Sequence, residues 1–265
     1  MVQHRGVEDL STDAFVLRTR AYGESDVIAV MLTRDHGKVA GIARGARRSR
    51  KRFAGPALEP FQELSLRFAR RPYSELAFFH ECRILVSHHR IADELMCFAW
   101  ASYVSELTER MTPERDPCPD LYELFRRTVE KLALGIDAEP TAHHFILGLL
   151  DRAGWGPDFS RCGTCGADID GGRQPILDPR GSGVICARHE AESSGQDPSD
   201  PSYRPSRRVL TQALLDYVRA AREDVPKIDA LAVQTDATKL LDRLVDLHLA
   251  RPLKSRRFLA EIRAG

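Results

Sequence analysis

Residues 12–43 read TDAFVLRTRAYGESDVIAVMLTRDHGKVAGIA, and this stretch decides the fold of the front of the chain. β-rich runs with apolar–polar alternation are separated by two turn signals, AYGE at 21–24 and HG at 36–37. This pattern predicts strands at 12–20, 26–33 and 38–43. Two more β-rich runs follow, at 64–68 and 76–84. Five short strands predict a small closed barrel, although the pattern alone also fits an SH3-like barrel.

From about residue 87 the apolar spacing becomes helical. Apolar residues recur three and four positions apart, and prolines or glycines punctuate the runs, as is typical of core-facing helices. These stripes lie near 91–111, 121–132, 145–150, 210–218 and 240–248.

The change of pattern divides the chain into four segments. Residues 156–190 are rich in Gly, Pro, Cys and Asp without a helical period, and a Ser- and Pro-rich loop follows them. We therefore expect a multi-domain α+β protein. Its expected segments are a barrel at 1–86, the first part of a helical body at 87–155, a cysteine-bearing insertion at 156–192, and a linker with the second part of the helical body at 193–265.

Composition excludes two broad classes of protein. Of the 265 residues, 43% are hydrophobic and 29% are charged, which excludes a disordered chain. No uncharged apolar run approaches the roughly 18 residues of a membrane-spanning helix. The first ten residues contain no apolar core of a signal peptide. We expect a cytoplasmic protein without a membrane partner.

Positive charge is concentrated at the front of the chain. The net charge is +1, but residues 1–86 hold 15 Lys and Arg against 10 Asp and Glu. Residues 44–52, which we call the basic run, contain six cations in nine residues. Such a run either keeps a loop solvated or meets a polyanion, and its place on a predicted barrel favours nucleic acid. The cations are Arg44, Arg47, Arg48, Arg50, Lys51 and Arg52.

Four residues of the insertion have the spacing of a metal site. Cys162 and Cys165 form one C-x2-C pair, and Cys186 and His189 form a second pair with the same gap. Three thiolates and one imidazole make a closed tetrahedral set, which predicts one structural Zn²⁺. Two reducible cysteine pairs in a loop, or a site that has lost its metal, remain alternatives. A catalytic zinc is disfavoured because four protein ligands leave no open position.

Other chemistry is sparse in this sequence. It contains no P-loop, no G-x-G-x-x-G after a strand and no G-x-S-x-G, so we predict no catalytic residues. We interpret Glu106 and Glu109 as a solvated helix face. Aromatic residues near the basic run, Tyr22, Phe53 and Phe61, could stack bases, but each fits a core position better.

The chain resembles the bacterial RecO family of DNA repair and recombination proteins. The resemblance covers nearly the whole length. It rests on GESD at 23–26, TRDHGK at 33–38, ARG at 43–45 followed by Arg47 and Arg48, LEPF at 58–61, and the tail LKSRRFL at 253–259.

The resemblance implies an N-terminal OB-fold, a helical body and a zinc-finger insertion. It implies a non-enzymatic mediator that binds single- and double-stranded DNA, contacts RecR and the C-terminal tail of SSB, helps to load RecA and anneals strands. Such a protein would join the nucleoid during repair. The candidate DNA-binding residues are then the basic run together with Lys38, Lys254, Arg256 and Arg257. We expect the helical body to bind the SSB tail, with Phe145, Leu149 and Leu150 lining a groove and Arg126 or Arg127 supplying a cation.

Two other functions fit the same residues. A zinc-dependent hydrolase of nucleic acid would use the cysteine insertion, and an RNA-binding OB-fold protein would use the same basic barrel, because a basic barrel does not by itself distinguish the two sugars.

Overall fold

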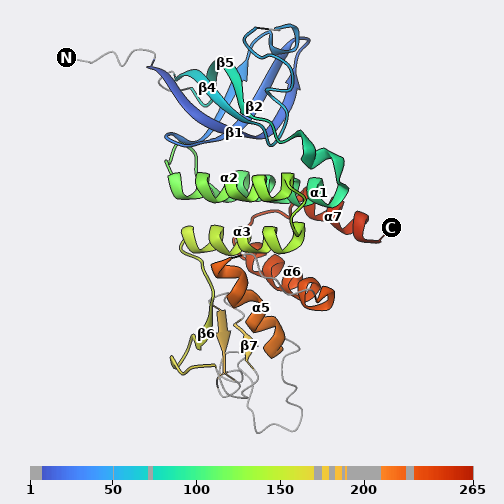
Figure 1. The fold of residues 1–265 in the computed structure, drawn as a ribbon. Helices are drawn as coiled ribbons and strands as arrows, with labels where there is room; N and C mark the ends of the chain where they lie inside the picture. Colours follow the sequence, from blue (N-terminus) through green and yellow to red (C-terminus); the bar gives the residue numbers. More distant parts are fainter. Residues whose placement is uncertain are drawn as a thin grey trace, which may run out of the picture. The chain divides into compact units, whose positions relative to one another are not determined.

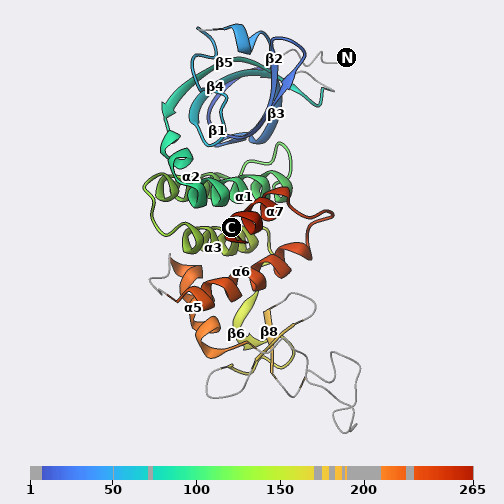
Figure 2. The same ribbon diagram turned by 90° about the vertical axis from the view of Figure 1, so that its right-hand side faces the viewer.

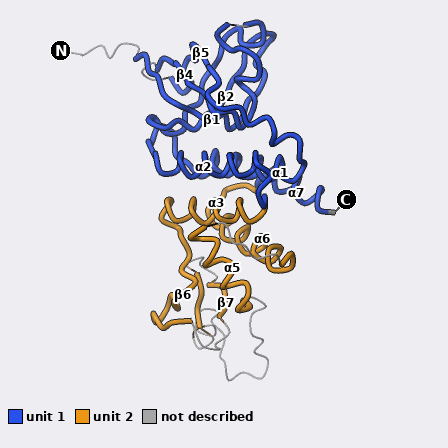
Figure 3. Tube along the Cα trace, in the orientation of Figure 1, with its two compact units in different colours: residues 1–138, 253–265 blue, residues 139–252 orange. Residues whose placement is uncertain are grey.

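The computed structural model describes residues 8–49, 51–70, 74–169, 175–178, 183–186, 189, 210–224 and 230–264 (Figure 1). The chain divides into two compact units, residues 1–138 with 253–265, and residues 139–252 (Figure 3). Each unit therefore contains part of the helical region. The segment boundaries expected at 86, 155 and 192 remain predictions.

The first unit begins with a closed five-stranded barrel (Figures 1 and 2). The strand order around the barrel is β1-β2-β3-β5-β4, and β4 pairs with β1 to close it. All the pairs are antiparallel except β3 with β5. This topology is that of an OB-fold, which confirms the barrel and decides its type. The strands are β1 (Glu8–Tyr22), β2 (Asp26–Thr33), β3 (Gly37–Ala43), β4 (Glu63–Arg70) and β5 (Ala77–Val86).

β1 is longer than its sequence pattern predicts. Residues before Thr12 pair with β4, from Glu8 opposite Arg70 onwards. In the middle of β1, Ala14, Phe15, Val16 and Leu17 are all buried. The side chains of Ala14 and Val16, on one face of β1, belong to the core of the barrel. The other face is covered by a helix, because the ring of Phe15 packs 5.3 Å from Tyr122 and 5.2 Å from Phe125, between ring centroids.

The turn before β3 requires a glycine. Gly37 has a φ of 65°, and a Cβ atom there would lie 2.3 Å from the backbone oxygen of Asp116. Any other residue would be strained and would also collide with this backbone. The HG turn signal is therefore also a point of close packing.

Helices complete the first unit. The 3₁₀ turns η1 (Ala46–Arg48) and η2 (His89–Asp93) accompany α1 (Leu95–Met111), α2 (Pro119–Ala133) and α7 (Lys254–Ala264). Trp100 and Tyr103 of α1 are fully buried. The sequence pattern did not separate α7 from the preceding helix, because its apolar stripe is short.

Two carboxylates that we interpreted as solvated are structural, and that interpretation was wrong. The Glu106 carboxylate accepts hydrogen bonds from the backbone N–H groups of Lys254 (3.1 Å) and Ser255 (2.8 Å), so it caps the start of α7. Burial opposes ionisation of this carboxyl, but the donors of Ser255 and Lys254 outweigh burial and lower its pKa. Glu109 forms a bidentate ion pair with Arg18 of β1, at 2.6 to 3.0 Å. Glu106 therefore joins α1 to α7, and Glu109 joins α1 to β1.

The second unit contains the cysteine-bearing segment and a small group of helices. Its elements are α3 (Ala138–Arg152), β6 (Asp158–Cys162), β7 (Ile176–Leu177), β8 (Gly183–Ile185), α5 (Gln212–Glu223) and α6 (Leu231–Asp246). The three strands form one sheet in the order β6-β8-β7. The fully buried His143 connects the helices, since its ring nitrogens lie 2.8 Å from the Tyr217 hydroxyl and 2.9 Å from the Thr238 hydroxyl.

Among the described residues, no helix is long and apolar enough to cross a membrane. The thiol of Cys97 is buried, and desolvation raises its pKa to about 11. This environment confirms that Cys97 acts as a small apolar residue of the core.

Candidate metal centre and nucleic-acid interface

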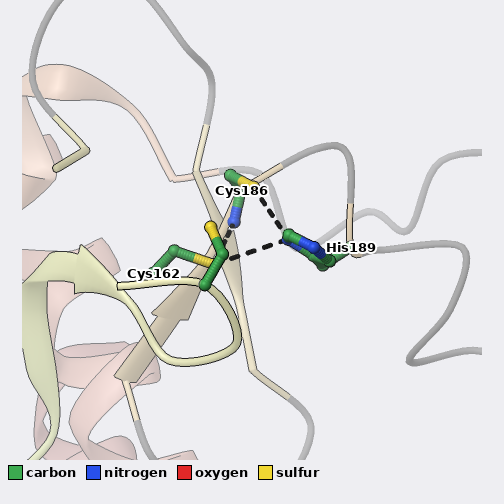
Figure 4. Close-up of side chains that lie close together, drawn as sticks. Cys162, Cys186 and His189 are labelled. Carbon is green, nitrogen blue, oxygen red and sulfur yellow. Dashed lines mark hydrogen bonds between the residues drawn. The ribbon is translucent and has the colours of Figure 1, made fainter. Parts of the chain in front are cut away.

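The four predicted metal ligands come together in the second unit. The ligand atoms of Cys162, Cys165, Cys186 and His189 all lie within 4.8 Å of one another. His189 Nδ1 is 3.1 Å from the Cys186 sulfur and 3.8 Å from the Cys162 sulfur, and these two sulfurs face the imidazole ring (Figure 4). In the described part of the chain this is the single group of three or more potential ligand side chains.

The local backbone explains why the two pairs meet. Cys162 ends β6 and Cys186 directly follows β8, and these two strands are paired in the sheet. The first pair turns at Gly166, whose φ is 67° and whose N–H donates to the Cys162 carbonyl at 2.8 Å. Gly163, which lies between the two cysteines, does not adopt a positive φ; the glycine that does is the one after Cys165.

The environment of Cys162 favours a thiolate. Burial raises the pKa of this thiol, but backbone N–H groups of Cys186, Cys165 and Thr164 donate to the sulfur. The net effect lowers the pKa of Cys162 to about 6. The Cys186 N–H lies 3.4 Å from the sulfur. Thiolates are the form in which cysteine binds metals.

These residues fit a tetrahedral ion. Zinc bonds of about 2.0 to 2.3 Å imply ligand-to-ligand distances of about 3.5 to 3.8 Å. The two sulfur–nitrogen distances of 3.1 and 3.8 Å lie close to that range. Three thiolates and one imidazole would occupy all four positions, with His189 contributing its Nδ1 atom.

The basic run lies between β3 and β4, beside the hairpin that joins β1 to β2. The Gly45 N–H donates to the Asp26 carboxylate at 2.8 Å, and the Arg47 N–H donates to the Ser25 carbonyl at 3.0 Å. The side chains of Arg44, Arg47, Arg48, Lys51 and Arg52 are exposed. Arg50 lies outside the described residues. The tertiary fold therefore adds the β1–β2 hairpin to the surface that carries these cations.

Tyr22 is the aromatic residue best placed to contact a base. It lies at the end of β1 in this hairpin and is 54% exposed. Phe53 and Phe61 are buried, as their core interpretation predicted, whereas the same interpretation was wrong for Tyr22.

Sequence reasoning missed two further cations on the barrel. Arg18 and Arg20 are exposed on β1 and line a groove of about 500 Å³ that crosses β1, β2 and β3. Glu109 and Glu114 also line this groove, and Glu109 pairs with Arg18, so Arg20 is the cation of the two without this partner. The two-residue spacing of Arg18 and Arg20 places them on one face of the strand, and this signal could have identified them.

Lys38 does not fit its predicted role. Its side chain lies in the same groove, but the amine donates a 2.6 Å hydrogen bond to the backbone carbonyl of Glu109, and only 9% of the residue is exposed. Burial lowers the pKa of this amine, although Glu114 and Glu109 act in the opposite direction. Lys38 therefore fastens β3 to α1, and we correct its assignment as a DNA ligand.

The other candidate DNA-binding cations lie at the start of a helix. Lys254, Arg256 and Arg257 belong to the first turn of α7. Lys254 and Arg257 are exposed, and Arg256 is half-buried. The Arg257 guanidinium pairs with Glu261 at 2.8 Å. A stabilising contact with a helix C-terminus therefore does not explain these cations.

An OB-fold barrel with a cationic loop, a helical body and a Cys/His cluster that could hold a metal ion are features typical of nucleic-acid-associated proteins. Comparison with known families agrees with this class. Residues 7–88 match the family model "Recombination protein O N terminal", and residues 94–257 match "Recombination protein O C terminal". The chain belongs to the RecO family, and its role is in DNA repair.

Two of three individual relatives match along nearly the full length, and the third matches over a shorter stretch. The chain is 33% identical over 259 residues to "DNA repair protein RecO" of Anaeromyxobacter sp. (strain Fw109-5), covering 96% of this chain and 97% of the relative. It is 33% identical over 257 residues to the protein of the same name in Myxococcus xanthus (strain DK1622), covering 97% and 99%. It is 39% identical over 158 residues to that of Syntrophobacter fumaroxidans, covering 60% and 62%.

Proposed function

We propose that this protein is a non-enzymatic recombination mediator of the RecF-pathway type. It binds single- and double-stranded DNA, helps to load RecA onto SSB-coated DNA and anneals complementary strands. It acts in the cytoplasm at the nucleoid. The observation that carries the proposal is the group of exposed cations of the basic run, held against the β1–β2 hairpin of an OB-fold barrel.

Phosphate contacts supply the affinity in this proposal. Arg44, Arg47, Arg48, Lys51 and Arg52 expose their charges on one loop, and Arg50 belongs to the same run. Binding of a polyanion releases counterions and relieves the repulsion among these cations. Lys254, Arg256 and Arg257 form a second candidate contact. The exposed Tyr22 offers a ring on which an unpaired base can stack.

The Cys/His cluster has a structural role in this proposal and holds one Zn²⁺. A hydrolase needs an open metal position for water, and the four ligands here leave none.

Binding and cleavage assays separate the three functions. We expect a labelled 30-nucleotide single strand of DNA to bind, and unlabelled RNA of the same sequence to compete more weakly than DNA. We expect intact DNA after incubation with the zinc-loaded protein and Mg²⁺. Equal or stronger competition by RNA would support the RNA-binding function, and metal-dependent nicking of the DNA would support the hydrolase.

We also propose that the protein contacts RecR and the SSB tail. In the family, that tail ends in acidic residues and a terminal apolar pair, so it needs apolar walls and a nearby cation. The groove expected around Phe145, Leu149 and Leu150 is wrong, because all three side chains are buried in the core. Arg126 and Arg127 are engaged by Glu123 on the same helix.

A different cavity, in the first unit, has the required chemistry. It measures about 750 Å³ and lies between β1, α1 and α7. Phe61, Phe98 and Phe258 give it aromatic walls, with ring centroids 5.8 and 6.1 Å from that of Phe98. Lys254 lies at the same cavity and is exposed. We place the SSB tail here.

Substitution of Phe98 tests this placement. We expect Phe98→Ala to weaken binding of an SSB tail peptide about 5- to 30-fold, because a central aromatic wall is lost. Lys254→Glu should weaken it further and reduce its dependence on salt. Leu95→Ala on the same helix is the matched control, since Leu95 is exposed and lies outside the cavity. If isothermal titration gives the same affinity for Phe98→Ala, Lys254→Glu and the wild type, the SSB tail does not bind in this cavity.

A further inference from the structure

Trp155 and His248 form a stacked pair in the second unit, on the surface. Their ring centroids are 4.1 Å apart and their planes differ by 2°. Trp155 is 41% exposed, and the neighbouring Leu247 is 51% exposed. One face of the indole is therefore covered by the imidazole, while much of the ring still meets solvent. Neither residue belongs to the metal cluster or to the cationic surfaces described above.

The backbone on both sides of this stack is fixed. Trp155 follows the last turn of α3, where Gly154 adopts a φ of 76° and the Trp155 N–H donates to the Leu150 carbonyl at 2.9 Å. His248 follows α6, and its N–H donates to the Val245 carbonyl at 3.0 Å. The ends of two helices therefore hold the two rings, so little side-chain entropy remains to be lost on binding.

Contacts to α5 hold the chain between α3 and β6. Arg222 pairs with both carboxylate oxygens of Asp151, and the Arg219 guanidinium donates to the Phe159 carbonyl at 2.8 Å. These contacts are made by residues four positions before and four positions after Trp155. They make the stack a preformed feature of the fold.

Charges of both signs surround the stack, and guanidinium groups are among them. A Cβ atom placed on Gly156, the residue after Trp155, would lie against the Asp151 carboxylate and 2.9 Å from the Arg222 guanidinium, and Asp246, two residues before His248, is exposed. Arg152, one turn before Trp155, and Arg251, three residues after His248, are both exposed. Asp151 offsets part of this charge through its pair with Arg222. A flat aromatic face beside guanidinium groups fits a nucleobase and its phosphates better than it fits an aliphatic side chain.

We propose that Trp155, supported by His248, is a stacking platform for one unpaired base of single-stranded DNA. It is a contact additional to the barrel, and this inference rests on the DNA binding proposed above. Stacking uses the π-face that every base has, so the contact is tolerant of sequence. It also requires an unpaired base, and so we expect it to favour single strands over duplex.

The two tryptophans of the chain allow a direct test by fluorescence. Trp100 is fully buried and Trp155 is exposed, so a bound base that stacks on the surface can quench only Trp155. Burial lowers the pKa of His248, and at pH 8 its ring is neutral and does not vary during a titration. We expect unlabelled oligo-dT to quench the emission of the wild type. Trp155→Phe should abolish the quenching but keep most of the affinity.

Affinity measurements complete the test. We expect Trp155→Ala to weaken binding of a labelled single strand about 5- to 50-fold and to leave duplex binding unchanged. Leu247→Ala is the matched control, because this exposed side chain is adjacent to His248 and has no base-stacking face.

Each outcome identifies which proposal fails. If the wild type binds oligo-dT by anisotropy but its tryptophan emission does not change, and Trp155→Ala binds normally, the platform is wrong and the DNA-binding function stands. If the wild type binds no DNA, the proposed function fails first. If an aromatic peptide quenches Trp155 and oligo-dT does not, the occupant is a protein, which also overturns this inference.

Discussion

Replacing Cys162 with serine is expected to remove the proposed Zn²⁺ and to loosen the small sheet of the second unit. Cys162 ends β6 and Cys186 follows β8, so an ion held by both would fasten two paired strands at their ends. β7 has two residues and β8 has three, which is too little to form a stable sheet alone. Structural zinc contributes on the order of 10 kcal/mol to a small isolated finger.

Metal content and hydrogen exchange measure this effect. We expect about one zinc per chain in the wild type by elemental analysis and essentially none in Cys162→Ser or Cys186→Ser. Amide protection should fall in β6, β7 and β8, while the barrel strands keep theirs because they have their own core. Cys118→Ser is the matched control, since this free cysteine lies outside the cluster. The structural role of zinc would be contradicted if wild-type protein prepared with excess zinc contained none. It would also be contradicted if a serine variant kept the amide protection of the sheet unchanged.

Removing four cations of the basic run is expected to give the largest loss of DNA affinity. Arg47, Arg48 and Lys51 are exposed, and Arg50 lies in the same run. If all four contact phosphates, their replacement by alanine lowers the salt dependence of single-strand binding by about 3, at roughly 0.7 per contact. We expect the affinity at low salt to fall on the order of 100-fold, with little dependence on sequence.

Anisotropy titrations at several salt concentrations give both quantities. The matched control is Arg67→Ala with Arg83→Ala, which removes two cations of the same barrel that pair with Glu81. We expect this control to change the slope much less than Arg47→Ala with Arg48→Ala. An unchanged affinity and slope in the folded quadruple variant would exclude the basic run from the interface.

Much of the fold follows from local sequence patterns. The alternation in 12–43 and the turn glycines predicted the barrel, because strands and tight turns depend on neighbouring residues. The pattern did not distinguish an OB-fold from an SH3-like barrel. That choice depends on β3 pairing with β5 and β4 pairing with β1, and such pairing is made between residues distant in the chain.

The four residues of the Cys/His cluster were predictable for a similar reason. Two pairs of ligands with a two-residue gap are a local signal, and the chemistry of zinc supplies the rest. The turn residue was less predictable, because Gly163 and Gly166 both flank a cysteine and only the backbone conformation shows which one adopts a positive φ.

By itself, the sequence determined the barrel strands, most of the helices, the four residues of the Cys/His cluster and the cationic loop. Only the tertiary structure decided where individual side chains point. The Lys38 amine donates to the Glu109 carbonyl and does not face solvent, and Glu106 caps a helix nearly 150 residues away in the chain. The Trp155 ring stacks on the His248 ring. Periodicity reports which face of an element is buried, whereas the partner of a polar or aromatic side chain depends on how distant elements pack, and no local pattern contains that information.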